Sequence, residues 1–192
     1  MSILVVNHIS LDGVLQGPGR PDEDTSGGFR HGGWAARAGS DPALAAAMSK
    51  RMSPGFSWLF GRRSYEDMLR HWNSVGGPMA DGLNGAVKYV ASSSPETELL
   101  WPNSVLVTGD VTAEIARLRD DISRDLVVMG SAHLVQTLIR RNLVDELLLF
   151  IHPVVLGSGK RLFGDDPDVH EFAMTDCTPT GGGVLIAGYR RA

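Results

Sequence analysis

The stretch that decides the fold is Asp125–Gly164, DLVVMGSAHLVQTLIRRNLVDELLLFIHPVVLGSGKRLFG. We interpret it as a strand at 126–129, a glycine turn at 130–131, a helix at 132–141, a second strand at 144–152 and a glycine-bearing loop. Because the helix follows the turn directly, its first N–H groups and the positive end of its dipole lie just beyond the strand. This pattern predicts an anion site, so a phosphate-bearing ligand is the first hypothesis.

The same alternation of strand and helix continues on both sides of this stretch. We expect further strands at 3–9, 57–60, 88–91 and 104–108, and further helices at 42–52, 62–72 and 111–121. Strands at 170–177 and 183–190 have no helix between them, so they should pair antiparallel at one edge. The expectation is one α/β domain over 1–192. It should have three layers, about four helices and a central, mostly parallel eight-stranded sheet.

Composition narrows the class of protein. With 43% hydrophobic and 21% charged residues, the chain reads as a soluble globular protein. Its formal charge of -4 argues against a nucleic-acid partner, and no apolar run approaches the roughly 20 residues that span a membrane. The N-terminus reads as a first strand rather than a signal peptide. Cys177 stands alone, which favours a cytoplasmic setting and a small core residue over a nucleophile.

Two further motifs suit phosphate. Gly61-Arg62-Arg63-Ser64 lies where a strand gives way to a helix, and two guanidiniums with a hydroxyl at a helix start can bind a phosphate monoester. The alternative is a solvated arginine pair. Ser92-Ser93-Ser94 follows another parallel strand, where a polar turn before Pro95 is the competing interpretation.

The end of the first strand carries polar residues that need partners. Asn7 and His8 interrupt an apolar run before Ser10-Leu11-Asp12-Gly13, and either a ligand or internal hydrogen bonds could satisfy them. Asp12 could donate a proton, anchor a substrate or cap the turn with Gly13. The long loop that follows, at 10–33, is typical of a lid or binding loop. Trp34, at the end of that loop, could cover a planar ring or fix the loop to the core.

Several sharper motifs are excluded. The segment around Gly159-Lys160-Arg161 resembles a P-loop, but Val154 stands where the first glycine belongs and Arg161 where Ser or Thr would bind magnesium. There is no G-x-G-x-x-G fingerprint and no nucleophile-elbow serine. The histidines are not spaced as metal ligands, so no metal site is expected.

Taken in order, these residues resemble the dihydrofolate reductase-like superfamily, and most closely its bacterial branch related to the reductase domain of riboflavin biosynthesis. The resemblance runs from Ile3 to Tyr189, and its pieces are specific in their order and spacing. They are Ser10-Leu11-Asp12-Gly13, Gly61-Arg62-Arg63-Ser64-Tyr65-Glu66, Lys88-Tyr89-Val90-Ala91-Ser92, Val128-Met129-Gly130-Ser131, Leu143-Val144-Asp145-Glu146-Leu147 and Pro153-Val154-Val155-Leu156-Gly157-Ser158-Gly159.

The resemblance implies NADPH bound across the sheet. It assigns Gly61, Arg62, Arg63, Ser64, Ser92 and Ser93 to the adenosine end with its 2′-phosphate, and Gly130, Ser131, Ala132, His133 and Leu134 to the pyrophosphate. The nicotinamide would lie near the end of the first strand and the loop at 10–17. Substrate would enter between that loop and the helix at 42–52, near Asn7, Ser10, Gly13 and Trp34, with Asp12 as the candidate catalytic residue.

Two departures from the family pattern matter. Ser131 replaces the second glycine of the family's Gly-Gly turn. The first helix lacks the acidic residue that holds a pterin in folate-reducing members, and only Asp41 lies near its start.

The chain therefore reads as an NADPH-dependent reductase of a small planar, heterocyclic substrate, related to pterins or pyrimidines. A dinucleotide-binding sensor or partner-binding module without turnover is the alternative. The resemblance also implies a homodimer. The apolar run at 144–151 suits such an interface and suits a buried central strand equally well.

Overall fold

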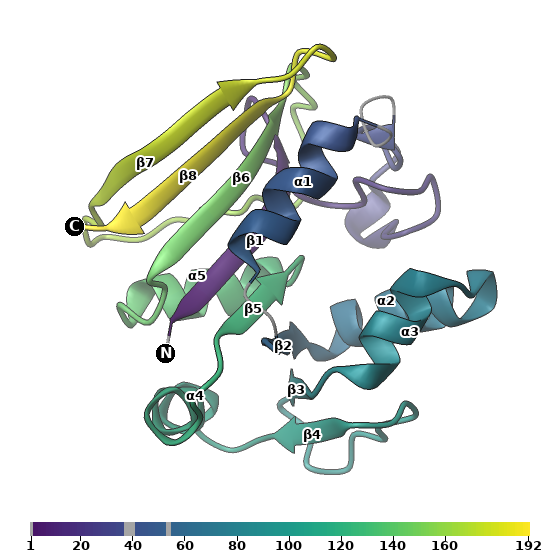
Figure 1. The fold of residues 1–192 in the computed structure, drawn as a ribbon, viewed down its shortest axis with the longest axis vertical. Helices are drawn as coiled ribbons and strands as arrows, with labels where there is room; N and C mark the ends of the chain where they lie inside the picture. Colours follow the sequence, from purple (N-terminus) through teal and green to yellow (C-terminus); the bar gives the residue numbers. More distant parts are fainter. Residues whose placement is uncertain (1, 37–40, 53–54) are drawn as a thin grey trace.

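The computed structural model describes residues 2–36, 41–52 and 55–192, and its centre is an eight-stranded sheet in the order β4-β3-β2-β5-β1-β6-β8-β7 (Figure 1). The strands are β1 (Ile3–Ser10), β2 (Ser57–Gly61), β3 (Lys88–Ala91), β4 (Ser104–Val107), β5 (Leu126–Met129), β6 (Glu146–His152), β7 (Phe172–Pro179) and β8 (Leu185–Arg191). Strands β1 to β6 are parallel, whereas β8 runs antiparallel to β6 and β7 antiparallel to β8. The expected mostly parallel sheet with an antiparallel C-terminal edge hairpin is confirmed.

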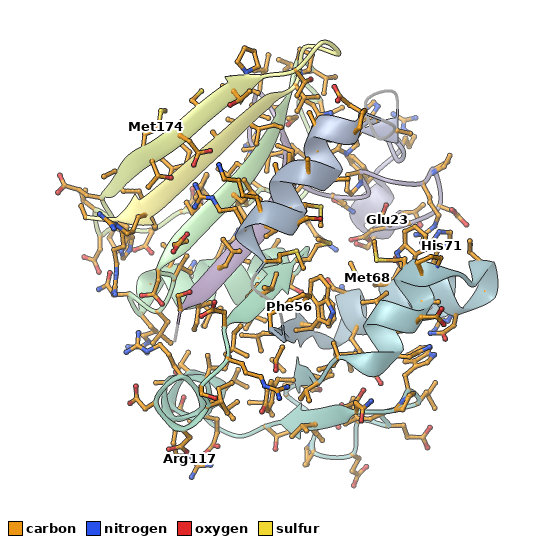
Figure 2. All side chains as sticks on the ribbon, viewed as in Figure 1. Glu23, Phe56, Met68, His71, Arg117 and Met174 are labelled. Carbon is orange, nitrogen blue, oxygen red and sulfur yellow. The ribbon has the colours of Figure 1, made fainter. Side chains whose placement is uncertain are left out.

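Helices cover both faces of the sheet, which gives the three expected layers. The helices are α1 (Pro42–Arg51), α2 (Arg62–Val75), α3 (Pro78–Gly85), α4 (Val111–Asp121) and α5 (Ala132–Arg140), with a short 3-10 turn, η1 (Ser26–Gly28), in the first loop. Alternate residues of each strand face opposite layers. Val6 and its row pack with α1, α2 and α3, whereas Val5 and its row pack with α4 and α5. Figure 2 labels Phe56 and Met68, two partly buried side chains that pack with the row of Val6.

One helix was not expected from the sequence. Within the described residues the chain forms five α-helices rather than about four, and the additional one is α3. It begins at Pro78, where the missing N–H costs nothing, but it contains Gly82 and Gly85, which weaken a helical pattern. Burial of Ala80 and Leu83 and packing of α3 against α2 stabilise it instead.

The C-terminal hairpin corrects the expectation for Cys177. This residue lies in β7, as a strand position should, but it is exposed rather than a small core residue. The reason is that β7 is an edge strand whose residues 173–179 are all exposed, including Met174 (Figure 2). The apolar run at 144–151 lies largely in β6, which pairs with β1 and β8 and is mostly buried. Its composition is thus explained within one chain.

The orientation of α1 matters for the site. Arg51 at its last turn pairs with Glu146 at the start of β6, with Nη1 and Oε2 2.9 Å apart. Helix α1 therefore runs antiparallel to β6 and carries its first residues, with Asp41 as N-cap, toward the carboxyl edge of the sheet (Figure 1). The Asp41 side chain accepts a hydrogen bond from Ala43 N at 2.9 Å.

A buried lysine lies at the start of β3. Lys88 is 0% exposed, and its Nζ donates to the carbonyl oxygens of Leu83, at 2.5 Å, and Ala86, at 2.8 Å. Leu83 lies in the last turn of α3 and Ala86 is its C-cap, so both carbonyls lie at the negative end of that helix dipole. Burial lowers the pKa of Lys88 to about 8.

Candidate functional site

The carboxyl ends of five parallel strands lie side by side in the order β3, β2, β5, β1 and β6. The predicted site residues follow these ends. Ser92 comes after β3, Gly61 ends β2, Gly130 comes after β5, and Ser10 ends β1. The structure thus brings the separate sequence motifs to one edge of the sheet, the edge where open α/β sheets bind ligands.

The turn between β5 and α5 has an unusual backbone. Gly130 has a φ of 64° and Ser131 a φ of 57°, so two successive residues adopt the left-handed conformation. Asn7 fixes this turn from the neighbouring strand. Gly130 N donates to Asn7 Oδ1 at 2.7 Å, and Asn7 Nδ2 donates to Gly130 O at 3.3 Å. Because Asn7 is only 3% exposed, its amide serves as an internal clamp, the second of the two roles considered for it.

Hydroxyl groups tie this turn to the start of α2. Ser131 N donates to Ser64 Oγ at 3.0 Å, and Gly61 N donates to Ser131 Oγ at 2.9 Å. The Ser131 side chain consequently does not cap α5, and the first N–H groups of that helix, at 132–134, have no side-chain partner within it. A Cβ at Gly130 would lie 3.2 Å from Ser64 Oγ, so the close approach favours glycine there. Two helix starts therefore meet at one point with N–H donors available for an anion.

The two arginines at the start of α2 differ. Arg62 Nη1 lies 2.9 Å from Glu66 Oε1, one turn along the same helix. Arg63 is exposed, and in the described part of the chain its guanidinium forms no ion pair. Arg63 is thus the cation of the pair that remains available to a ligand.

The serines after β3 also differ. Ser92 is 6% exposed, and its hydroxyl lies 2.7 Å from Thr97 Oγ1 and accepts from Ser94 N at 3.1 Å. This hydroxyl organises the turn that follows β3. Ser93 is exposed and lies beside it.

The turn after β1 is held from within. Ser10 is 1% exposed, and its Oγ donates to Asp12 Oδ1 at 2.7 Å and accepts from Val14 N at 2.9 Å. Gly13, with a φ of 79°, closes the turn through its N–H to Ser10 O at 3.0 Å. The Asp12 carboxylate accepts from Leu156 N, at 3.1 Å, and Gly157 N, at 2.9 Å.

These contacts decide what Asp12 can do. The hydrogen bonds from Ser10, Leu156 and Gly157 hold the pKa of Asp12 well below its usual range. A carboxylate that stays ionised is a poor proton donor at neutral pH. Of the three roles considered for Asp12, the geometry favours the capping role and argues against the catalytic one, because the side chain joins the first turn to the loop after β6.

The long first loop is fixed to the same later loop. Gln16 is 4% exposed, and its Oε1 accepts from Lys160 N at 2.9 Å while Nε2 donates to Ser26 O at 3.0 Å. Lys160 Nζ pairs with Asp24 Oδ2 at 2.6 Å. Gly159 makes this contact possible, since a Cβ there would lie 2.7 Å from Val14 Cγ1. Sequence reasoning missed this network because its partners lie more than 130 residues apart.

Four aromatic side chains gather toward the ends of β1 and β6. His8 Nδ1 lies 2.8 Å from His152 Nε2, and the His8 ring also contacts Phe150, with centroids 4.8 Å apart. The Trp34 ring meets His152 edge-on at 5.3 Å, and its Nε1 donates to Gln16 O at 2.7 Å. Trp34 therefore fixes the loop to the core. The sequence drew attention to His8 but not to His152, because only the parallel register of β1 and β6 brings the two rings together.

Two cavities, of about 770 and 500 Å³, lie apart from this edge cluster. They lie beside α5 and the segment at 163–172, and the second also borders β6 and Ile9 of β1; neither is lined by a predicted site residue. Among the described residues, no three His, Cys, Asp or Glu side chains are grouped so that they could hold a metal ion. None of the helices within residues 2–36, 41–52 and 55–192 has the length and apolar character needed to cross a membrane.

Comparison with solved structures shows where this fold occurs. A protein from Shewanella sp. PV-4 named for riboflavin biosynthesis superimposes with a TM-score of 0.71 at 19% identity, covering 100% of this chain and 99% of that one. Dihydrofolate reductase from Enterococcus faecalis, solved with NADP(H), gives 0.63 at 15%, covering 99% and 96%. A pyrimidine reductase-like protein from Corynebacterium diphtheriae gives 0.65 at 10%, covering 100% and 92%. These likenesses confirm the dihydrofolate reductase-like fold.

Sequence comparison identifies the family as well as the fold. YyaP of Bacillus subtilis strain 168, an uncharacterised protein, is 34% identical over 136 residues, which are 68% of this chain and 71% of YyaP. The model of the RibD C-terminal domain family matches residues 2–186. Because that match spans nearly the whole chain and joins the motifs described above, the chain belongs to the RibD C-terminal domain family.

Proposed function

We propose that this protein is an NADPH-dependent reductase that transfers a hydride to a small planar, heterocyclic substrate of the pterin or pyrimidine class. The observation that carries the proposal is the junction of two helix starts at Gly130, Ser131 and Ser64, with N–H donors left over and Arg63 beside them. The E. faecalis reductase with this fold binds NADP(H), and the C. diphtheriae relative is named for pyrimidine reduction.

The residues at this edge fit the dinucleotide. The N–H groups at 132–134 would hold the pyrophosphate, because they are the free donors at the positive end of the α5 dipole, and Gly130 has no Cβ beside them. Arg63, with Arg62 and Ser93 nearby, would hold the 2′-phosphate through charge-assisted hydrogen bonds. When bound, the reduced nicotinamide supplies the hydride. The chain supplies orientation and a site from which water is excluded.

Substrate would lie between the turn at 10–13 and the start of α1. Asp41 is the acidic residue that the described part of α1 brings to this edge, and its carboxylate already caps the helix through Ala43 N. This arrangement disfavours dihydrofolate, whose pterin needs a free carboxylate in the folate-reducing relatives. A smaller heterocycle without that requirement fits better.

The alternative proposal is an NADPH-binding module without turnover, and one observation favours it. The first loop is fixed by Trp34, Gln16 and the Lys160–Asp24 ion pair, whereas an enzyme often needs such a loop to close over its substrate. The two proposals share the cofactor site and differ in whether hydride leaves the cofactor.

The first experiment is a titration of the purified chain with NADPH and NADH, followed by quenching of tryptophan fluorescence and by energy transfer to the nicotinamide. Micromolar binding of NADPH and much weaker binding of NADH supports the cofactor site. NADPH oxidation is then measured with pterins, pyrimidines and quinones. Binding without oxidation of NADPH by any of these favours the module, and absence of binding contradicts both proposals.

A further inference from the structure

The contact between His8 and His152 has a chemical consequence. Two ring nitrogens 2.8 Å apart are within hydrogen-bond distance, and a hydrogen bond between neutral imidazoles needs one proton on one of the two nitrogens. If His152 Nε2 carries it, His8 must carry its own proton on Nε2. If His8 Nδ1 carries it, His8 Nε2 is bare. The tautomer of His152 therefore determines whether His8 Nε2 is a hydrogen-bond donor or an acceptor.

The two rings differ in their access to solvent. His152 is 3% exposed, while His8 is only partly buried at the carboxyl end of β1. Burial, and then the neighbouring His152, lower the pKa of His8 to about 4, and burial also lowers the pKa of His152. Both rings are thus neutral at pH 7. A pair of neutral imidazoles can pass a proton along without holding a net charge in a dry environment.

The pair lies next to the proposed cofactor turn. Asn7, which precedes His8, holds Gly130 by a hydrogen bond. Strand β1 lies between β5, which ends at this turn, and β6. Strand alternation places His8 in the row of Leu4 and Val6, on the face covered by α1, where substrate is proposed to enter.

Other ionisable groups near this edge are accounted for. At the carboxyl ends of β1 and β6 and the start of α1 they are Asp12 and Asp41. Each carboxylate is already hydrogen-bonded to backbone N–H groups. Farther along the same elements, Arg51 pairs with Glu146, and Asp24 of the first loop pairs with Lys160. The ring contacts of the pair in the described part of the chain are with Phe150 and Trp34, which do not titrate at physiological pH.

We propose that His8 is a catalytic residue that gives the substrate its proton, and that His152 is the positioning residue that replaces this proton from behind. The inference rests on the proposed reductase function. The N–H bond at His8 Nε2 breaks as a bond to hydrogen forms on the substrate nitrogen or oxygen next to the reduced carbon. At the same time His8 Nδ1 takes the proton of His152 Nε2, and a hydronium ion from solvent gives a proton to His152 Nδ1 and leaves as water. The substrate gains one hydride and one proton, and both imidazoles end neutral.

Nuclear magnetic resonance of the whole chain, labelled with ¹⁵N-histidine, tests the pair without turnover. The variants His8→Gln and His152→Gln assign the two rings, and His71→Gln on α2 is the matched control. We expect His152→Gln to change the tautomer pattern of His8, and saturating NADP⁺ to shift the His8 resonances at pH 7. His71→Gln should leave the tautomer pattern of His8 unchanged, and NADP⁺ should still shift the His8 resonances in this variant. Unchanged His8 resonances with NADP⁺ bound overturn the relay but leave the reductase proposal standing, whereas failure of NADP⁺ to bind overturns both.

Kinetics with NADPH and a small pyrimidine acceptor give the second readout. His8→Gln should lower kcat by about 10²-fold or more, the usual size of a lost general acid, while the Kd for NADPH stays within about twofold. His152→Gln should lower kcat less, by about tenfold, and should reduce the solvent isotope effect, because the proton behind His8 no longer moves. A His8→Gln variant that oxidises NADPH at the wild-type rate contradicts the assignment. If the wild-type chain does not reduce this acceptor, the resonance shifts alone decide.

Discussion

Two regions at the same edge of the sheet are built in opposite ways. The β5–α5 turn with the start of α2 is held by short hydroxyls and one amide, and it leaves backbone N–H groups and Arg63 unused. The first loop, at 10–34, is held by acceptors such as Asp12 and the Gln16 amide, which take up backbone N–H groups from the loop after β6. The first region therefore offers donors to an anion, whereas the polar groups of the second are already used in hydrogen bonds that hold the loop. On the proposed function, the anion would bind in the first region and the planar ring would lie beside the second.

The largest expected effect concerns Gly159, in the loop after β6 on which the first loop is docked. It separates the cost of tight packing from the cost of backbone strain. Gly159→Ala places a Cβ 2.7 Å from Val14 Cγ1 and 2.8 Å from Phe29 Cε2, at a φ of 119°. We expect a loss of about 3 kcal/mol in the free energy of unfolding, measured with urea. Gly157→Ala is the control, because its φ is 75° but nothing lies within 4 Å, so only about 1 kcal/mol should be lost. Equal losses would show that the first loop is not docked on Gly159.

The next effect tests whether Arg63 is the cation that remains available to a ligand. Replacing Arg62 and Arg63 together with Ala should weaken NADPH binding far more than NADH binding. Arg63→Ala alone should account for most of this loss, about 2 kcal/mol or about thirtyfold in Kd, because Arg62 is engaged by Glu66. Fluorescence titration of each variant with both cofactors measures the difference. An equal loss for NADPH and NADH removes the 2′-phosphate from this site.

A smaller effect concerns the turn itself. Ser131 is in the left-handed region at a φ of 57°, which costs a non-glycine residue about 1 kcal/mol, and its hydroxyl accepts from Gly61 N. Both Ser131→Gly and Ser131→Ala lose the hydroxyl, so the Ala variant should be less stable by about 1 kcal/mol. The same pair at the exposed Ser93, which is not among the residues of positive φ, should show the reverse order. Thermal unfolding of the four variants checks the sign.

The smallest effect tests whether Trp34 holds the loop. Trp34→Phe keeps an aromatic ring against His152 but removes the 2.7 Å hydrogen bond to Gln16 O, so stability should fall by about 1 kcal/mol with the Kd for NADPH unchanged. Trp72→Phe on α2 serves as the comparison variant. A substrate KM that rises in Trp34→Phe while stability is unchanged would favour a role in covering a planar ring.

Much of the geometry of the candidate anion site could be predicted from the sequence because its signals are local. A glycine turn, a helix start and the Gly61–Ser64 segment each fit within a few residues, and parallel topology places their strand ends at one edge. The sequence also marked Asn7 as a residue in need of a partner. It could not show that the partner is the turn at Gly130, because that depends on which strand lies next to β1.

The first loop resisted prediction for the same physical reason. Its contacts to the loop after β6 join residues more than 130 positions apart, so no spacing rule within a window reveals them. The sequence argued against a P-loop around Gly159 and Lys160, but the structural role of this segment follows only from the docked loop. Cys177 was misplaced because alternation along a strand says nothing of whether that strand is at an edge.

The reactivity of the buried Lys88 amine can be used to measure local unfolding of the chain. The chain has three lysines, at positions 50, 88 and 160, and Lys88 is the one that is fully buried. With its pKa at about 8, its amine is largely neutral, and so nucleophilic, at pH 9, yet an acylating reagent reaches it only when the contact between β3 and α3 opens. The rate at which the Lys88 amine is acylated would therefore report local unfolding of this corner, counted in minutes or hours by mass spectrometry, with the exposed Lys50 as the internal reference.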